Sequence, residues 1–172
     1  MGYGIVLVMK KSFEGSGSFE GRVAYAKKFE QLTKDLVVDA GGVQYYEDFS
    51  EKYDEVRLRT RDRFEVCICQ NLIRIWTSLQ WWTFFDWDSH RLSQRKEFQK
   101  MIDLIQPEDC WIGTDYATDQ TCDVEVGFDE WLKDVQKEFG PIGEFDFDSL
   151  FEELKRDVWP RDLYHVKNNS LY

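Results

Sequence analysis

The chain has 172 residues, of which 42% are hydrophobic and 16% aromatic, and its formal net charge is −11 at pH 7. This length and apolar content predict one folded domain with a sizeable core and exclude a disordered chain. No run of about 18 uncharged apolar residues occurs, so the sequence predicts no membrane span. The first residues also lack the pattern of a signal peptide, and we therefore expect a cytoplasmic protein.

The first half of the chain predicts a strand, a helix and then several strands. An apolar run indicates a buried strand over residues 3–9, and a Gly/Ser-rich loop at 14–18 leads into a helix over about residues 21–38. Gly41 and Gly42 are expected to end that helix. The loop has the spacing Gly-x-Gly-x-x-x-Gly, which matches neither a dinucleotide-binding loop nor a P-loop, so we interpret it as a turn.

The middle of the chain alternates apolar and polar residues, as strands do. In residues 56–60 Val and Leu alternate with Arg, and the alternation resumes at 64–68 after a predicted hairpin turn at 61–63. Residues 71–76 and 79–85 predict one long strand or two. The same region is rich in aromatic residues, which we interpret mainly as core: Trp76, Trp81, Trp82, Phe84, Phe85 and Trp87.

The second half predicts three helices and two short strands. A helix over about residues 91–105 is capped by Asp88 or Ser89, strands follow at 110–112 and 122–126, and helices cover 128–139 and 149–158. This order predicts a single α+β domain over residues 1–172, with a mixed or mainly antiparallel central sheet. We expect the helices to pack on one side of that sheet.

The four cysteines are expected to be reduced thiols, because a domain of this size needs no disulfides and carries no secretion signal. They are Cys67, Cys69, Cys110 and Cys122.

The negative charge is concentrated in one segment. Residues 1–102 contain 16 basic and 15 acidic residues, whereas residues 103–157 contain 4 basic and 17 acidic residues. Two interpretations are open: a surface that only keeps the protein soluble, or an acidic face that attracts a basic partner. Either one disfavours direct binding of nucleic acid, which requires clustered Lys and Arg.

The helix over 128–139 indicates which carboxylates face a partner. Its spacing turns Trp131, Leu132, Val135 and Phe139 toward the core and leaves the acidic positions nearer to solvent. With carboxylates from the neighbouring loops, the predicted partner-binding residues are Asp115, Asp119, Asp129, Glu130, Asp134, Glu138, Glu144 and Asp146.

An enzymatic alternative rests on Asp86, Asp88 and His90, which follow an apolar strand directly. Two carboxylates and an imidazole can hold a divalent metal, so these residues are compatible with a metal-dependent hydrolase or phosphotransferase. Helix capping explains Asp88 equally well. A third possibility is a domain that binds a small ligand in an aromatic pocket.

The favoured hypothesis is a small acidic cytoplasmic binding protein, and it includes no catalytic residue, metal or cofactor. Immunity proteins that neutralise nuclease-type toxins share its profile of small size, acidity and many aromatic residues. The sequence thus favours an inhibitor or immunity-type antitoxin that engages a basic protein such as a nuclease toxin. We expect a monomer or weak dimer that binds no membrane.

Overall fold

The computed structural model describes residues 4–33, 40–45, 56–60, 64–80, 88–114, 128–146, 148–149 and 163–172. In these ranges the strands are β1 (Gly4–Lys10), β2 (Ala40–Tyr45), β3 (Val56–Thr60), β4 (Phe64–Ile68), β5 (Leu72–Gln80), β6 (Asp109–Thr114), β7 (Gly143–Glu144) and β8 (Leu163–His165). The helices are α1 (Phe19–Thr33), α3 (Asp88–Ile105) and α5 (Phe128–Phe139), and a short 3-10 helix, η2, covers Lys167–Asn169.

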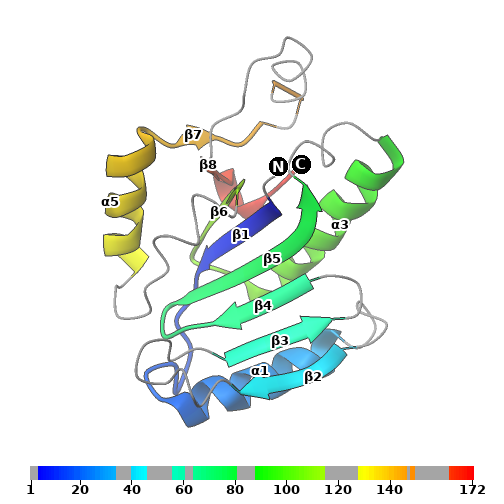
Figure 1. Cartoon of the computed structure of the whole chain (residues 1–172), viewed down its shortest axis with the longest axis vertical. Helices are drawn as coiled ribbons and strands as arrows, with labels where there is room; N and C mark the ends of the chain where they lie inside the picture. The colour runs from blue at the N-terminus through cyan, green and yellow to red at the C-terminus, as the bar shows by residue number, and fades with distance from the viewer. Residues whose placement is uncertain are drawn as a thin grey trace.

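The strands form one sheet in the order β2-β3-β4-β5-β1-β6-β8-β7 (Figure 1). Neighbouring strands are antiparallel, except for β7 and β8, which are parallel. The predicted α+β fold with a mixed, mainly antiparallel sheet is therefore confirmed.

Strand β1 lies inside the sheet between β5 and β6 and is buried on both faces. Ile5, Leu7 and Met9 belong to one apolar cluster, whereas Val6 and Val8 belong to a second cluster on the opposite face. A strand covered on both faces needs apolar residues at consecutive positions, which explains the unbroken run in the sequence.

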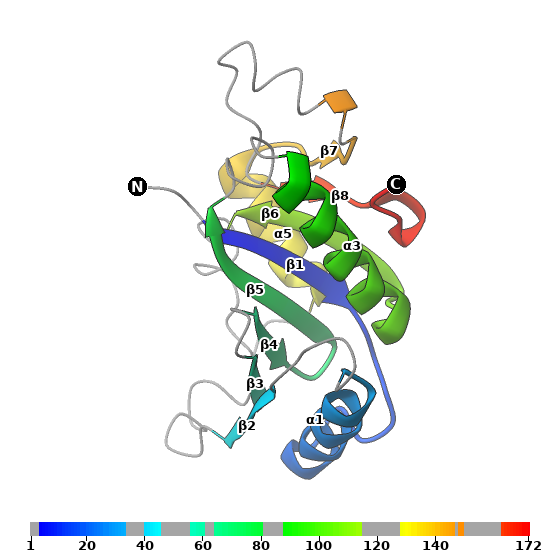
Figure 2. The same cartoon turned by 90° about the vertical axis from the view of Figure 1, so that its right-hand side faces the viewer.

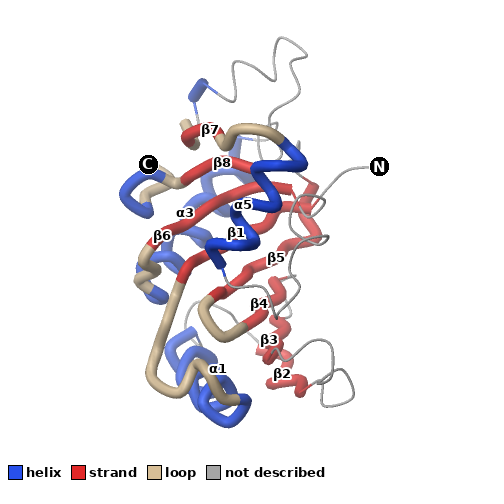
Figure 3. Tube along the Cα trace, turned by 90° about the vertical axis from the view of Figure 1, so that its left-hand side faces the viewer, coloured by secondary structure: helices blue, strands red, loops and turns tan. Residues whose placement is uncertain are grey.

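The expectation that the helices pack on one side of the sheet is wrong. Helices α1 and α3 cover one face through residues such as Phe29 and Phe98, and α5 covers the other through Phe128 and Trp131. Figures 2 and 3 view the molecule from opposite sides and show α3 and α5 on opposite faces of β1 and β6. The apolar stripe of a helix shows that the helix packs against another element, but it does not show which face of the sheet the helix covers.

The glycine-rich loop is the N-terminal cap of α1. Ser18 Oγ accepts a hydrogen bond from the backbone N–H of Gly21 at 3.1 Å, as an N-cap serine does. Gly15 has φ +79°, and an added Cβ on Gly21 would lie 1.9 Å from the carbonyl oxygen of Gly15. The glycines therefore permit a left-handed turn and a close approach of two backbone segments, which agrees with the predicted turn.

Gly41 and Gly42 lie within β2 and do not end a helix, so that prediction is wrong. The pairing of β2 with β3 shifts register between Ala40 and Val43, where the two glycines stand. Glycine inside a strand often marks such a bulge. The predicted strand at 122–126 lies outside the described residues, as does all of the predicted helix at 149–158 apart from Ser149.

In the part of the chain that the structure describes, no helix is both long enough and apolar enough to cross a membrane.

The thiols of Cys67, Cys69 and Cys110 are reduced and buried. Burial raises the pKa of Cys110 far above its ordinary value, so this thiol stays protonated and unreactive near neutral pH.

In native protein these three thiols should react slowly with 5,5′-dithiobis(2-nitrobenzoate). Four thiols should react after denaturation without reductant. Rapid modification of Cys110 in the native protein, located by peptide mass mapping, would contradict its burial. Finding two or fewer reactive thiols after denaturation would contradict the prediction that the cysteines are reduced.

Candidate functional site

Helix α5 presents an apolar side to the sheet and an acidic side to solvent. Phe128, Trp131 and Val135 are at most 2% exposed and pack in the cluster that contains Val6 and Val8. Aromatic contacts continue this packing from the helix into the sheet, because the ring of Phe128 lies 4.8 Å from that of Trp111 on β6. The predicted inward side of this helix is confirmed for Trp131 and Val135, and Leu132 is partly buried against the same cluster.

An ion pair ties the start of α5 to the end of β1. Lys10 Nζ donates to Asp129 Oδ1 at 2.9 Å and lies 5.5 Å from the centre of the Phe128 ring. The hydrogen bond to Asp129 raises the pKa of Lys10 above its ordinary value. Asp129 is exposed, as predicted, but its charge is partly neutralised within the chain.

Three carboxylates form a row on the outer side of α5: Glu130, Asp134 and Glu138. All three are exposed and lie four residues apart, which places them on one side of the helix about 6 Å from one another. Within the described residues none of the three makes a hydrogen bond or ion pair. Like charges at this spacing repel weakly, so the row does not stabilise the helix by itself. We call these three residues the carboxylate row.

The predicted residues beyond α5 are partly engaged in local structure. Glu144 on β7 is exposed, and its Oε2 lies 3.8 Å from Nζ of Lys167. Asp146 Oδ1 accepts hydrogen bonds from the backbone N–H groups of Asp148 and Ser149, both at 3.1 Å. This pattern is an Asx turn, so the Asp146 carboxylate stabilises the local backbone as well as contributing its charge.

A histidine–aspartate pair links β6 and β8 on the face of the sheet that carries α5. His165 Nε2 lies 2.6 Å from Asp109 Oδ1, and the His165 ring lies 5.2 Å from the ring of Trp111. A carboxylate in this position can orient an imidazole for acid–base chemistry. The sequence did not indicate the pair, because the three-residue strand that carries His165 has no periodic signal.

The remaining predicted site residues lie partly or wholly outside the described part of the chain. Asp115, Asp119 and Asp86 are among the residues that the structure does not describe. Asp88 and His90 fall in the first turn of α3, where only the backbone is described. In the residues that are described, no group of three or more His, Cys, Asp or Glu side chains is placed to hold a metal ion.

The fold and the site define an α+β protein whose mainly antiparallel sheet carries an acidic helix on one face and two helices on the other. No protein-family model, curated protein or solved structure matches the chain.

Proposed function

We propose that this protein is a small cytoplasmic binding protein of the inhibitor or immunity type, which engages a basic protein partner through the outer side of α5. The partner presents clustered Lys and Arg side chains, as a nuclease toxin does.

The observation that carries this proposal is the carboxylate row. Its three charges are exposed and have no ion-pair partner within the described residues, while the opposite side of the same helix is buried in the core. A helix packed through aromatic side chains holds such charges at fixed spacing, which lowers the entropic cost of binding. Complementary potential then steers the encounter and raises the association rate.

The two lysines of α5, Lys133 and Lys137, are also exposed and lie beside the row. They reduce the local negative potential, so the outer side of α5 carries charges of both signs. A partner that opposes them with acceptors and the row with cations gains specificity from both signs.

The test is a comparison of immobilised proteins exposed to an extract of the native source and eluted with a salt gradient. The wild type should retain a basic protein in stoichiometric amount, and the variant Glu130→Gln/Asp134→Asn/Glu138→Gln should release it at clearly lower salt. The variant should keep its fold, since exposed charges contribute little to stability.

A matched control removes the same amount of charge from the opposite side of the molecule. The variant Glu20→Gln/Glu97→Gln/Asp103→Asn carries its changes on α1 and α3. It should retain the partner like the wild type. Equal weakening by both triple variants would mean that net charge alone causes retention, and the assignment to α5 would be wrong.

A further inference from the structure

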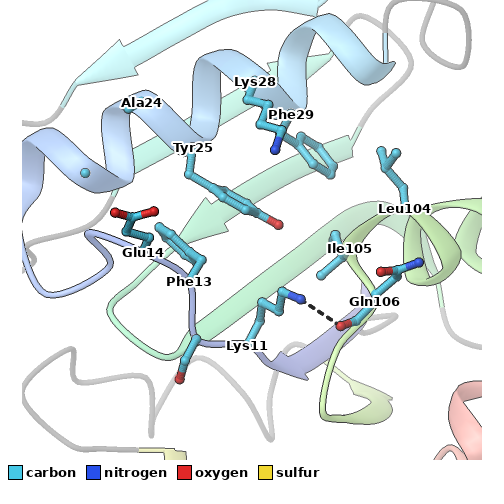
Figure 4. A pocket seen from close by; sticks show the side chains of 12 residues that line it. Lys11, Phe13, Glu14, Ala24, Tyr25, Lys28, Phe29, Leu104, Ile105 and Gln106 are labelled. Atoms are coloured by element: carbon cyan, nitrogen blue, oxygen red, sulfur yellow. Dashed lines mark hydrogen bonds between the residues drawn. The ribbon is translucent and has the colours of Figure 1, made fainter.

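A cavity of about 600 Å³ lies between α1, the end of α3 and the loop after β1 (Figure 4). It is on the face of the sheet opposite to α5, so it is separate from the carboxylate row. Its volume is within the range of about 300–1,000 Å³ that is usual for small-molecule sites.

The walls of this cavity combine apolar and aromatic side chains with polar and charged ones. Phe29 and Ile105 are buried and Leu104 is partly buried, and the three form one side. On the other side the rings of Phe13 and Tyr25 stack, with centroids 4.0 Å apart and an angle of 19° between their planes. Stacked rings form a flat apolar wall, which suits a planar ligand.

Among the polar side chains that line the cavity, those of Tyr25 and Lys28 make no hydrogen bond or ion pair within the described residues, and Lys28 is exposed. The Tyr25 hydroxyl points into the cavity, and the Lys28 ammonium lies beside Phe29 (Figure 4). Burial raises the pKa of Tyr25, so its hydroxyl stays protonated at neutral pH and can donate. Lys11, in contrast, is engaged, because its Nζ donates to the carbonyl oxygen of Gln106 at 2.9 Å.

The loop that supplies Phe13 is closed by a hydrogen bond of its own and tied to α1 by a second one. Ser16 N donates to the Phe13 carbonyl oxygen at 3.0 Å, and Arg22 Nη1 donates to the Ser16 carbonyl oxygen at 2.7 Å. The aromatic wall is thus anchored to the helix that carries Tyr25 and Lys28. A wall that is already in place loses little entropy when a ligand binds.

We propose that this cavity binds a small planar aromatic anion, such as an aromatic carboxylate or sulfonate. The ring lies against the Phe13–Tyr25 wall and the apolar side chains opposite, and the acid group accepts hydrogen bonds from Lys28 Nζ and Tyr25 Oη. Glu14 also lines the cavity, and its negative charge opposes an acid group placed near it, so the acid group of the ligand must lie on the Lys28 side.

Two fluorescent probes test the proposal: 1-anilinonaphthalene-8-sulfonate and its uncharged analogue N-phenyl-1-naphthylamine. They share a ring system and differ in the sulfonate, so their comparison isolates the charge. The net charge of −11 repels an anionic probe from the surface in general, and saturable 1:1 binding of the sulfonate would therefore indicate a local site.

The Lys28→Gln variant should weaken binding of the sulfonate probe about tenfold and leave the neutral probe unchanged, because it removes one charge-assisted hydrogen bond. Its matched control is Lys27→Gln, which is exposed on the same helix but does not line the cavity. This control should bind both probes like the wild type. Tyr25→Phe should weaken the sulfonate probe alone, by about threefold to tenfold, through loss of one hydrogen bond.

A variant that fills the cavity tests whether the probes bind there. Ala24 is exposed and lines the cavity, so Ala24→Trp should fill the space without disturbing the core and abolish binding of both probes. Circular dichroism and the Tm would show that each variant is folded. The proposal is overturned if the sulfonate probe does not bind at 1:1, or if Lys28→Gln and Tyr25→Phe bind it like the wild type.

Discussion

Replacing Trp131 by alanine is expected to lower the free energy of unfolding by about 3–5 kcal/mol, as deletion of a large buried aromatic side chain does. Trp131 is 1% exposed, and its ring lies 5.3 Å from that of Phe128 within the cluster that joins α5 to the sheet. Chemical unfolding in urea, followed by circular dichroism, measures the change without depending on tryptophan fluorescence.

Two control variants separate packing from other effects. Trp131→Phe should cost less than the alanine variant, because Nε1 of Trp131 is buried without a hydrogen-bond partner in the described part of the chain, and phenylalanine removes that unsatisfied donor. Lys133→Ala, on the exposed side of the same helix, should change stability by no more than about 0.5 kcal/mol. If Trp131→Ala were as mild as Lys133→Ala, α5 would not be packed on the sheet.

Replacing Gly21 by alanine should destabilise the protein by about 2 kcal/mol, although alanine is the better helix former by about 1 kcal/mol. The new Cβ would lie 1.9 Å from the Gly15 carbonyl oxygen and 2.5 Å from the Gly15 carbonyl carbon, so backbone would have to move. This clash outweighs the gain in helix propensity.

Thermal unfolding of Gly21→Ala beside Gly17→Ala measures the difference directly. At Gly17 the nearest atom to an added Cβ is Nε2 of Gln70 at 3.8 Å, an ordinary contact, so that variant should unfold near the wild-type Tm. A Gly21→Ala variant with a wild-type or higher Tm would show that the loop does not approach α1 in this way.

The parts of the fold that could be predicted from the sequence are those with a long periodic signal. The apolar run of β1 and the amphipathic pattern of α5 each span several residues and determine which side chains are buried. The two-residue and three-residue strands β7 and β8 carry no such signal and were not predicted. At Gly41 and Gly42 the sequence predicts the end of a helix, whereas the structure has a bulge in β2, because a glycine pair is compatible with either.

The carboxylate row could be predicted because exposure on a helix follows from its 3.6-residue period. The ion-pair and hydrogen-bond partners of the other charged residues could not be predicted. Lys10 and Asp129 are 119 positions apart in the sequence, and only the packing of α5 beside the end of β1 brings them together. The Asx turn at Asp146 depends likewise on local backbone geometry that charge counting does not detect.

These contacts decide which three carboxylates the triple variant replaces. A test on charge alone would have included Asp146, whose replacement also disturbs a turn. Glu138 is the better third position, because it is exposed on α5 and makes no hydrogen bond or ion pair within the described residues.

Whether the carboxylate row attracts a basic partner is tested by the association rate constant with the captured protein, determined by stopped-flow or surface-binding kinetics at two ionic strengths. For the wild type it should fall steeply as salt rises, because screening shortens the range of attraction to about 10 Å at 0.1 M. Glu130→Gln/Asp134→Asn/Glu138→Gln should associate about tenfold more slowly at low salt, with a flatter salt dependence. Lys133→Gln/Lys137→Gln should associate faster than the wild type. If the triple variant showed the wild-type rate and salt dependence, the carboxylate row would serve solubility alone, and the proposed function would be contradicted.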